Sequence, residues 1–250
     1  MSERERITIK KTFEGKEFDV VYIKGNPGKS KAELDEMRAR GERVSHHSYC
    51  APLTPRVYES APGINCYQDV ACRLRDGTTI YCDIYRPAHT TEKIPVIVSW
   101  GAYGKRPAEG QDEWKLMGVP PRTVSEMAKF ESADPAYWCY YDYAVANVDP
   151  RGVGNSEGNL NLWGTEDAQD GYDFIEWITA QDWCNGKATL FGNSGVCMGN
   201  WKIAAAQPPH LVCLAAWEGI SDLYRESYFC GGVPNPDYEA GIINTCACPQ

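Results

Sequence analysis

A serine placed between a strand-like segment and a helix-like segment is the feature that most constrains the fold of this chain. The apolar residues 188–191 lead into a Gly-Asn-Ser-Gly turn that contains Ser194, and the helix-like residues 196–206 follow at once. A strand, a sharp turn and a helix in this order hold a serine exposed as a nucleophile. Small neighbours suit such a turn, because a Cβ at a positive φ is costly. Val196 stands where the usual G-x-S-x-G pattern has its second glycine.

From about residue 70 the chain alternates between strand-like and helix-like segments. We expect strands over residues 70–73, 79–85, 96–100, 144–148, 188–191 and 212–216. We expect helices over residues 122–130, 166–180 and 196–206. In the second of these helices the apolar positions Ala168, Tyr172, Ile175 and Ile178 recur at helical spacing. The alternation predicts an α/β fold, with a mostly parallel sheet flanked by helices.

A polar segment precedes this core. Residues 7–9 suggest a short strand, and residues 30–40 suggest a helix with Ser30 as its N-terminal cap and Gly41 beyond its end. Three prolines then indicate an extended linker: Pro52, Pro55 and Pro62. We therefore expect a leader and linker over residues 1–65, a partial α/β core over 66–220, and the start of a cap region over 221–250.

Composition argues against several classes of function. The 250 residues carry a net charge of −9, whereas a nucleic-acid partner would favour basic patches. No apolar run approaches the length of a membrane span, and the N-terminus is charged, unlike a signal peptide. We therefore expect a cytoplasmic protein with neither a nucleic-acid nor a membrane partner.

Metals, nucleotides and disulfides are not expected either. An odd count of eleven cysteines, without a secretion signal, fits reduced thiols better than a disulfide framework. Cys246 and Cys248 lack the spacing and the second pair of a zinc site. The glycine run of residues 152–158 lacks the Gly-Lys-Ser/Thr ending of a phosphate loop. The sequence therefore predicts no cofactor and no metal.

Six motifs between residues 75 and 234 resemble, in their order along the chain, the cocaine esterase and X-prolyl dipeptidyl-peptidase group of α/β-hydrolases (CocE/NonD). These motifs lie at residues 75–87, 96–105, 149–158, 166–171, 182–187 and 190–195. The resemblance implies an α/β-hydrolase core that is incomplete at its C-terminus. It also implies that the acid and the histidine of the catalytic triad, and a jelly-roll domain, would lie beyond Gln250.

The same resemblance implies roles for three residues. Ser194 is the expected nucleophile, and the backbone N–H of Gly195 and the hydroxyl of Tyr103 are the expected oxyanion-hole donors. The expected reaction is hydrolysis or acyl transfer on an ester, amide or thioester, through an acyl-enzyme made from a small-molecule acyl substrate.

Other polar residues are expected to have structural roles. No histidine is well placed to act as the base, and we assign surface or capping roles to His46, His47, His89 and His210. Asp149 and Arg151 are expected to hold the loop after a strand, and Cys197 is expected to be a small core residue. Three alternatives stay open: an active serine hydrolase, a truncated and catalytically silent homologue, and a non-enzymatic binding protein. Formation of a homo-oligomer also stays open.

Overall fold

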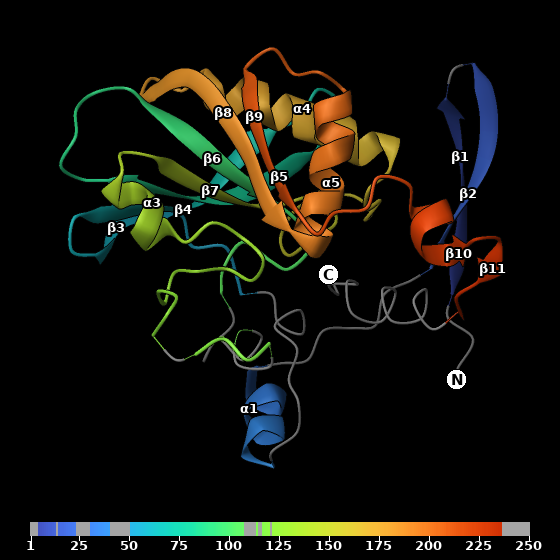
Figure 1. Ribbon diagram of the computed structural model, residues 1–250, viewed down its shortest axis with the longest axis horizontal. Coiled ribbons are helices and arrows are strands. Elements are labelled where there is room, and N and C mark those ends of the chain that lie inside the picture. Colours follow the sequence, from blue (N-terminus) through green and yellow to red (C-terminus); the bar gives the residue numbers. More distant parts are fainter. Residues whose placement is uncertain are drawn as a thin grey trace.

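The core of the molecule is a seven-stranded sheet with helices on both faces (Figure 1). The computed structural model describes residues 5–13, 15–23, 31–40, 51–107, 114, 117–120 and 122–236. In spatial order the strands are β3 (Arg56–Ala61), β4 (Ile64–Arg73), β5 (Thr79–Pro87), β7 (Ala144–Asp149), β6 (Ile94–Trp100), β8 (Cys184–Asn193) and β9 (Leu211–Trp217).

The sheet has an antiparallel half and a parallel half. Strands β3, β4, β5 and β7 pair antiparallel, whereas β7, β6, β8 and β9 pair parallel. The first three strands are joined by short turns, which permit only antiparallel pairing, and the parallel strands are joined by longer crossovers. The sheet is therefore mixed rather than mostly parallel, and its parallel half is the half that carries Ser194.

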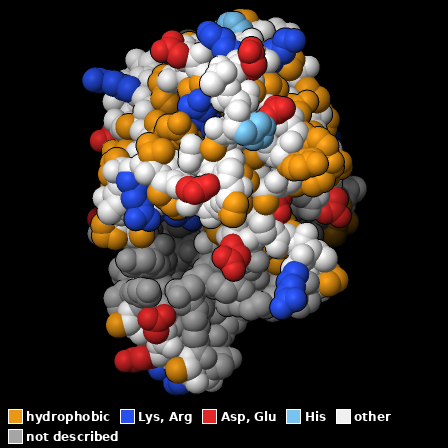
Figure 2. Space-filling view, turned by 90° about the vertical axis from the view of Figure 1, so that its left-hand side faces the viewer, with side chains coloured by type: hydrophobic (Ala, Val, Ile, Leu, Met, Phe, Trp, Pro, Cys, Tyr) orange, Lys and Arg blue, Asp and Glu red, His pale blue; other side chains and the backbone are white. Residues whose placement is uncertain are grey.

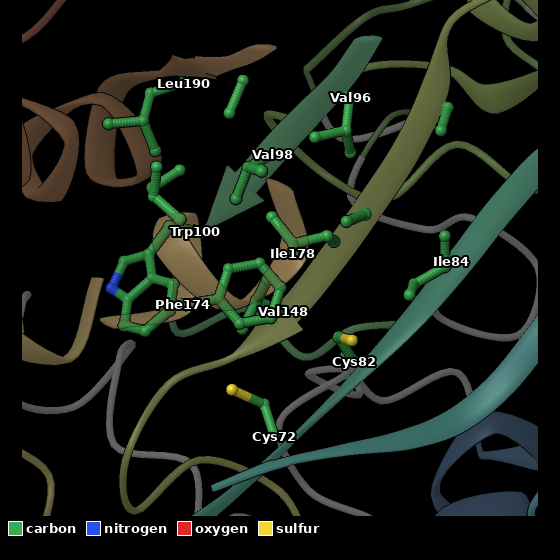
Figure 3. Close-up of a cluster of buried hydrophobic side chains, with 14 of the residues drawn as sticks. Cys72, Cys82, Ile84, Val96, Val98, Trp100, Val148, Phe174, Ile178 and Leu190 are labelled. Atoms are coloured by element: carbon green, nitrogen blue, oxygen red, sulfur yellow. The ribbon is translucent and has the colours of Figure 1, made fainter. Parts of the chain in front are cut away.

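Two layers of apolar side chains cover the sheet. Along β6, Val96 and Val98 belong to a cluster with α4 (Thr165–Thr179) and α5 (Ser194–Ala205). Figure 3 shows part of this cluster, in which Trp100 lies beside Phe174. Ile97 points to the other face, where it packs in a second cluster with Cys139 of α3 (Pro135–Tyr140). This alternation fixes the register of β6, because a slip of one residue would exchange the two faces.

Helix α3 is short and amphipathic. Asp134 caps its first turn by accepting a hydrogen bond from the N–H of Ala136. Pro135 suits the first helical position, because an N–H there would have no partner within the helix. Its residue Cys139 is buried, whereas Tyr137 and Tyr140 are exposed. Figure 2 faces the end of the molecule where β3 and α3 lie, and hydrophobic side chains there are interspersed with charged ones.

All six expected strands are present, and each extends beyond the expected bounds. The helices expected over residues 166–180 and 196–206 are confirmed as α4 and α5. The helix expected over residues 122–130 is wrong, because this segment forms turns. Arg122 has a φ of 67°, which no right-handed helix accommodates, and Ser125 donates from its N–H to Asp134 rather than continuing a helix.

The segment before the core is more ordered than its composition suggests. Strands β1 (Arg6–Phe13) and β2 (Lys16–Ile23) form an antiparallel hairpin, followed by α1 (Lys31–Ala39). Ser30 and Gly41 lie outside the described residues. The expected linker is partly wrong, because residues 56–65 belong to β3 and β4 and turn at Gly63, whose φ is 78°.

Beyond β9 the described chain contains only short elements. They are the π-helical turn η3 (Tyr224–Tyr228) and a two-stranded pairing of β10 (Phe229–Cys230) with β11 (Val233–Pro234). Strand β9 forms one edge of the sheet, where Val212 is 58% exposed and Trp217 is 49% exposed. None of the described helices is both long enough and apolar enough to cross a membrane.

Candidate active site

Ser194 lies where β8 ends and α5 begins. It is the first residue of the helix, and its φ of 46° is unusual for a residue with a side chain. The turn is tight, because a Cβ added to Gly192 would lie 2.4 Å from Cγ1 of Val196. Val196 is fully buried, and its other methyl, Cγ2, would be 2.8 Å from a Cβ added to Gly101. The side chain of Val196 therefore fits here because Gly192 at the end of β8 and Gly101 after β6 have no side chains.

Tyr103 reaches the same turn from the loop after β6. A Cβ added to Gly195 would lie 2.5 Å from the Tyr103 hydroxyl oxygen, so that hydroxyl lies directly against the backbone of Gly195. The Tyr103 ring packs edge-on against Phe130, with ring centroids 5.3 Å apart. On the other side of the helix start, Nε1 of Trp163 donates to the carbonyl of Gly195 at 3.0 Å. The three residues singled out from the sequence thus converge on one turn.

Glu131 is a member of this site that the sequence did not reveal. Its carbonyl accepts a hydrogen bond from the N–H of Asn193 at 3.0 Å, and its φ is 57°. Burial raises the pKa of its carboxyl to about 7, although hydrogen bonding with the N–H of Val196 and with Tyr103 and Ser194 acts in the opposite direction. Its Oε2 atom is buried and has no hydrogen-bond partner among the described residues.

A buried ionic cluster fixes the loop that carries Tyr103. Nζ of Lys105 lies 2.8 Å from Asp149 and 3.4 Å from Asp69, and Nε of Arg106 lies 2.7 Å from Asp83. Arg106 also pairs with Asp69. Lys105 is only 4% exposed, so its charge depends on these partners. The cluster joins the loop after β6 to β4, β5 and β7, and it is positioned to hold Tyr103 in place.

Lys129 is a second buried cation near this cluster. Its Nζ lies 3.4 Å from the carbonyl oxygens of Ser99 and Val148, and its side chain is fully buried. Burial lowers the pKa of Lys129 to about 8, whereas the charges of Asp149 and Glu131 act to raise it. The lysine therefore interacts electrostatically both with the ionic cluster and with Glu131.

The remaining polar residues singled out from the sequence lie in structural positions. Arg151 pairs with Asp170 at 2.7 Å and with Asp76 at 2.7 Å, across the loop that follows β7. Asp149 pairs with Lys105 instead of Arg151. Cys197 is fully buried, and burial raises the pKa of its thiol, which is the setting of an inert cysteine.

Neither described histidine contacts Ser194. His89 pairs with Asp142 at 2.8 Å, and His210 pairs with Glu176 at 2.7 Å. His210 immediately precedes β9, whereas Ser194 follows β8, and these strands run parallel. His210 therefore lies at the start of the parallel strands β8 and β9, at the opposite end from Ser194. His46 and His47 are outside the described residues, and the described part of the chain contains no cluster of three or more His, Cys, Asp or Glu side chains suited to a metal.

The loop after β9 closes against the same turn. Nδ2 of Asn193 donates to Oε2 of Glu218 at 2.9 Å. A Cβ added to Gly219 would lie 2.3 Å from Sγ of Cys197, so the loop passes very close to α5. Two glutamates thus lie near the serine turn: Glu131 in the connection from β6 to β7, and Glu218 in the loop after β9.

Comparison with known proteins identifies a family and several relatives of this chain. The family described as X-Pro dipeptidyl-peptidase (S15 family) matches residues 76–243. A protein named as a serine esterase of Mycobacterium bovis is 27% identical over 188 residues, which are 74% of this chain and 29% of that protein. Cocaine esterase from a Rhodococcus species is 27% identical over 164 residues, which are 66% of this chain and 25% of that enzyme.

A solved structure supports the same comparison. A CocE/NonD family hydrolase from Staphylococcus aureus superposes with a TM-score of 0.64 at 30% identity, covering 82% of this chain and 38% of that protein. The expected α/β-hydrolase core is thereby confirmed. The chain spans less than two fifths of the length of each of these relatives.

Proposed function

Because this chain belongs to the X-Pro dipeptidyl-peptidase (S15) family of α/β-hydrolases, we propose that it carries the nucleophile and oxyanion hole of a serine hydrolase. The observation that carries the proposal is the convergence of Tyr103 and Gly195 on the turn of Ser194. An acyl-transfer site needs donors fixed in advance where negative charge develops. The closeness of the Tyr103 hydroxyl to Gly195, next to Ser194, supports this role for the two groups.

The proposed reaction begins with attack of Ser194 Oγ on the carbonyl carbon of an ester, amide or thioester. The Oγ–C bond forms, the hydroxyl proton passes to a base, and the carbonyl electron pair moves to oxygen. The resulting oxyanion is stabilised by Gly195 and Tyr103. Its collapse breaks the bond to the leaving group, which takes the proton from the base and departs as an alcohol, amine or thiol. The remaining acyl-enzyme is then resolved by water or an alcohol.

Neither of the two described histidines is placed to act as this base. His89 and His210 are both engaged elsewhere, each with a carboxylate. In α/β-hydrolases the acid and the histidine follow the serine along the chain. A chain without that base would be the silent homologue or binding protein named above, and turnover measurements distinguish these cases.

The relatives suggest which substrates to test first. One of them is named as a cocaine esterase and another as a serine esterase, so simple esters are the first choice. We further propose that the protein is cytoplasmic. We also propose that it binds no nucleic acid, which its net charge of −9 supports. Sedimentation would establish whether it forms a homo-oligomer.

The test is hydrolysis of p-nitrophenyl esters by the purified chain and by two serine variants. Ser194→Ala removes the proposed nucleophile and is expected to abolish turnover. Ser221→Ala is the matched control, because Ser221 bonds to Glu226 in the loop after β9 and is not part of the turn. Turnover that survives in Ser194→Ala would contradict the proposal, and absence of turnover in the unaltered chain would favour the silent homologue.

A further inference from the structure

Glu131 is fixed to the serine turn through its backbone. The bond from the N–H of Asn193 to the carbonyl of Glu131 ties it to the residue just before Ser194. Its φ of 57° places it in the left-handed region, which costs energy for a residue with a side chain. Such strained residues often lie at reaction sites. The hydrogen bond from Asn193 holds the backbone of Glu131 beside the residue that precedes α5.

Several hydrogen-bonding groups lie near the carboxyl. The hydroxyls of Tyr103 and Ser194 and the N–H groups of Gly195 and Val196 lower its pKa, against the larger effect of burial. Two of these donors are those assigned to the oxyanion hole, namely Tyr103 and Gly195. The carboxyl of Glu131 therefore lies near both groups proposed to bind the oxyanion.

Other titratable groups also face Glu131. Lys129 and Cys197 both interact electrostatically with its carboxyl, from the segment before Glu131 and from α5 respectively. Lys129 is fully buried and bonds to two backbone carbonyls, so it does not pair closely with Glu131. The buried atom Oε2 of Glu131 has no hydrogen-bond partner in the described part of the chain.

A carboxylate and an oxyanion cannot share these donors without repulsion. Two like charges within a few ångströms strongly disfavour double ionisation in a site shielded from water. An ionised Glu131 would therefore oppose formation of the oxyanion. A neutral carboxyl releases the donors and can itself donate a hydrogen bond.

We propose that Glu131 is a further residue of the reaction site that controls use of the oxyanion hole. This inference rests on the proposed function. As a carboxylate, Glu131 engages Tyr103 and Gly195; as a neutral acid, it leaves both donors to the carbonyl oxygen of the acyl substrate. The proton that converts the Glu131 carboxylate into the neutral acid exchanges with solvent. The proposal adds no covalent step to the reaction.

The direct test is the rate of labelling by a fluorophosphonate, which reacts with an activated serine and develops charge on its phosphoryl oxygen. The rate is measured from pH 5 to pH 9 for the unaltered chain and for Glu131→Gln. The ratio of the two rates cancels the titration of the base, because both proteins share that base. Asp142→Asn is the matched control, because it removes one exposed carboxyl at a site paired with His89.

The ratio of Glu131→Gln to unaltered protein is expected to rise with pH. With the pKa of Glu131 at about 7, the neutral acid is about one tenth of the population at pH 8, so the ratio should approach about ten there. The Asp142→Asn ratio should stay near one at every pH. A ratio for Glu131→Gln that is independent of pH, or that is below one above pH 7, would overturn the inference about Glu131. Labelling that still depends on Ser194 would in that case continue to support the proposed function.

A second measurement does not depend on reactivity. In protein carrying ¹³C-labelled glutamate, the carboxyl resonance lost in Glu131→Gln belongs to Glu131 and can be titrated directly. If Tyr103 stabilises the carboxylate, Tyr103→Phe must raise the midpoint of that titration. An unchanged midpoint overturns the inference. If no fluorophosphonate labelling occurs in any protein, the proposed function fails, and this titration decides the role of Glu131 by itself.

Discussion

The hydroxyl of Tyr103 lies so close to Gly195 that no methyl group fits between them. A Cβ at position 195 would be 2.5 Å from that hydroxyl oxygen, well inside any normal contact. The closeness explains why glycine follows the serine here, although Gly195 itself is not among the glycines with a positive φ. The two groups form a single unit, and a change in either should disturb the other.

Replacing Gly195 with alanine is therefore expected to displace Tyr103 from the serine turn. The rate of Ser194 labelling should fall on the order of 100-fold, the effect of losing one oxyanion donor. Gly199→Ala is the matched control in the same helix, because its Cβ would meet its nearest atom, Cδ1 of Trp100, at an ordinary 3.5 Å. Equal labelling rates in the two variants would count against the contact between Tyr103 and Gly195.

The stability of the protein should depend on pH through Glu131. The pKa of its carboxyl is raised from 4.5 to about 7 in the folded state, so the neutral form is favoured by folding. Its contribution to the free energy of unfolding is fully present below pH 4.5 and is lost as the pH rises through about 7.

Glu131→Gln, which cannot ionise, removes this dependence. The difference in free energy of unfolding between the variant and the unaltered protein should grow in favour of the variant by on the order of 3 kcal/mol between pH 4.5 and pH 7.5. Urea denaturation at several pH values measures it. A constant difference would show that Glu131 titrates normally.

The ionic cluster behind Tyr103 gives a prediction about stability. Lys105→Met leaves Asp69 and Asp149 without this partner in a buried setting, and it should lower the free energy of unfolding by about 3–5 kcal/mol. Lys10→Met removes an ion pair with Glu17 in which both side chains are at least 67% exposed, and it should change stability by less than about 1 kcal/mol. Similar losses in both variants, measured by urea denaturation, would contradict the structural role of the cluster.

The serine turn could be predicted from the sequence because its signal is local. Residues 188–206 contain a strand pattern, a glycine-rich turn and a helix pattern in direct succession. The convergence of Tyr103 on Gly195 was also predictable, because the motif after β6 resembles the family and parallel strands end at one edge of a sheet. Both features could be predicted because they follow from the order of strands, turns and helices along the sequence.

Glu131 and the ionic cluster could not be predicted, because their partners are distant in sequence. Lys105 meets Asp69 and Asp149 only after the sheet has formed. Residues 122–130 have helical propensity, but the bonds from the N–H and hydroxyl of Ser125 to Asp134 hold them in turns. Tertiary contacts outweigh propensity in this segment, and they bring Glu131 to the serine.

Identification of the labelled residue tests the central claim most directly. The purified chain is treated with a fluorophosphonate, digested, and mapped by mass spectrometry. The account predicts one adduct on the peptide that contains Ser194, absent after Ser194→Ala and slowed by Tyr103→Phe. An adduct on any other residue, or no adduct on Ser194 under conditions that label a known serine esterase, would contradict it.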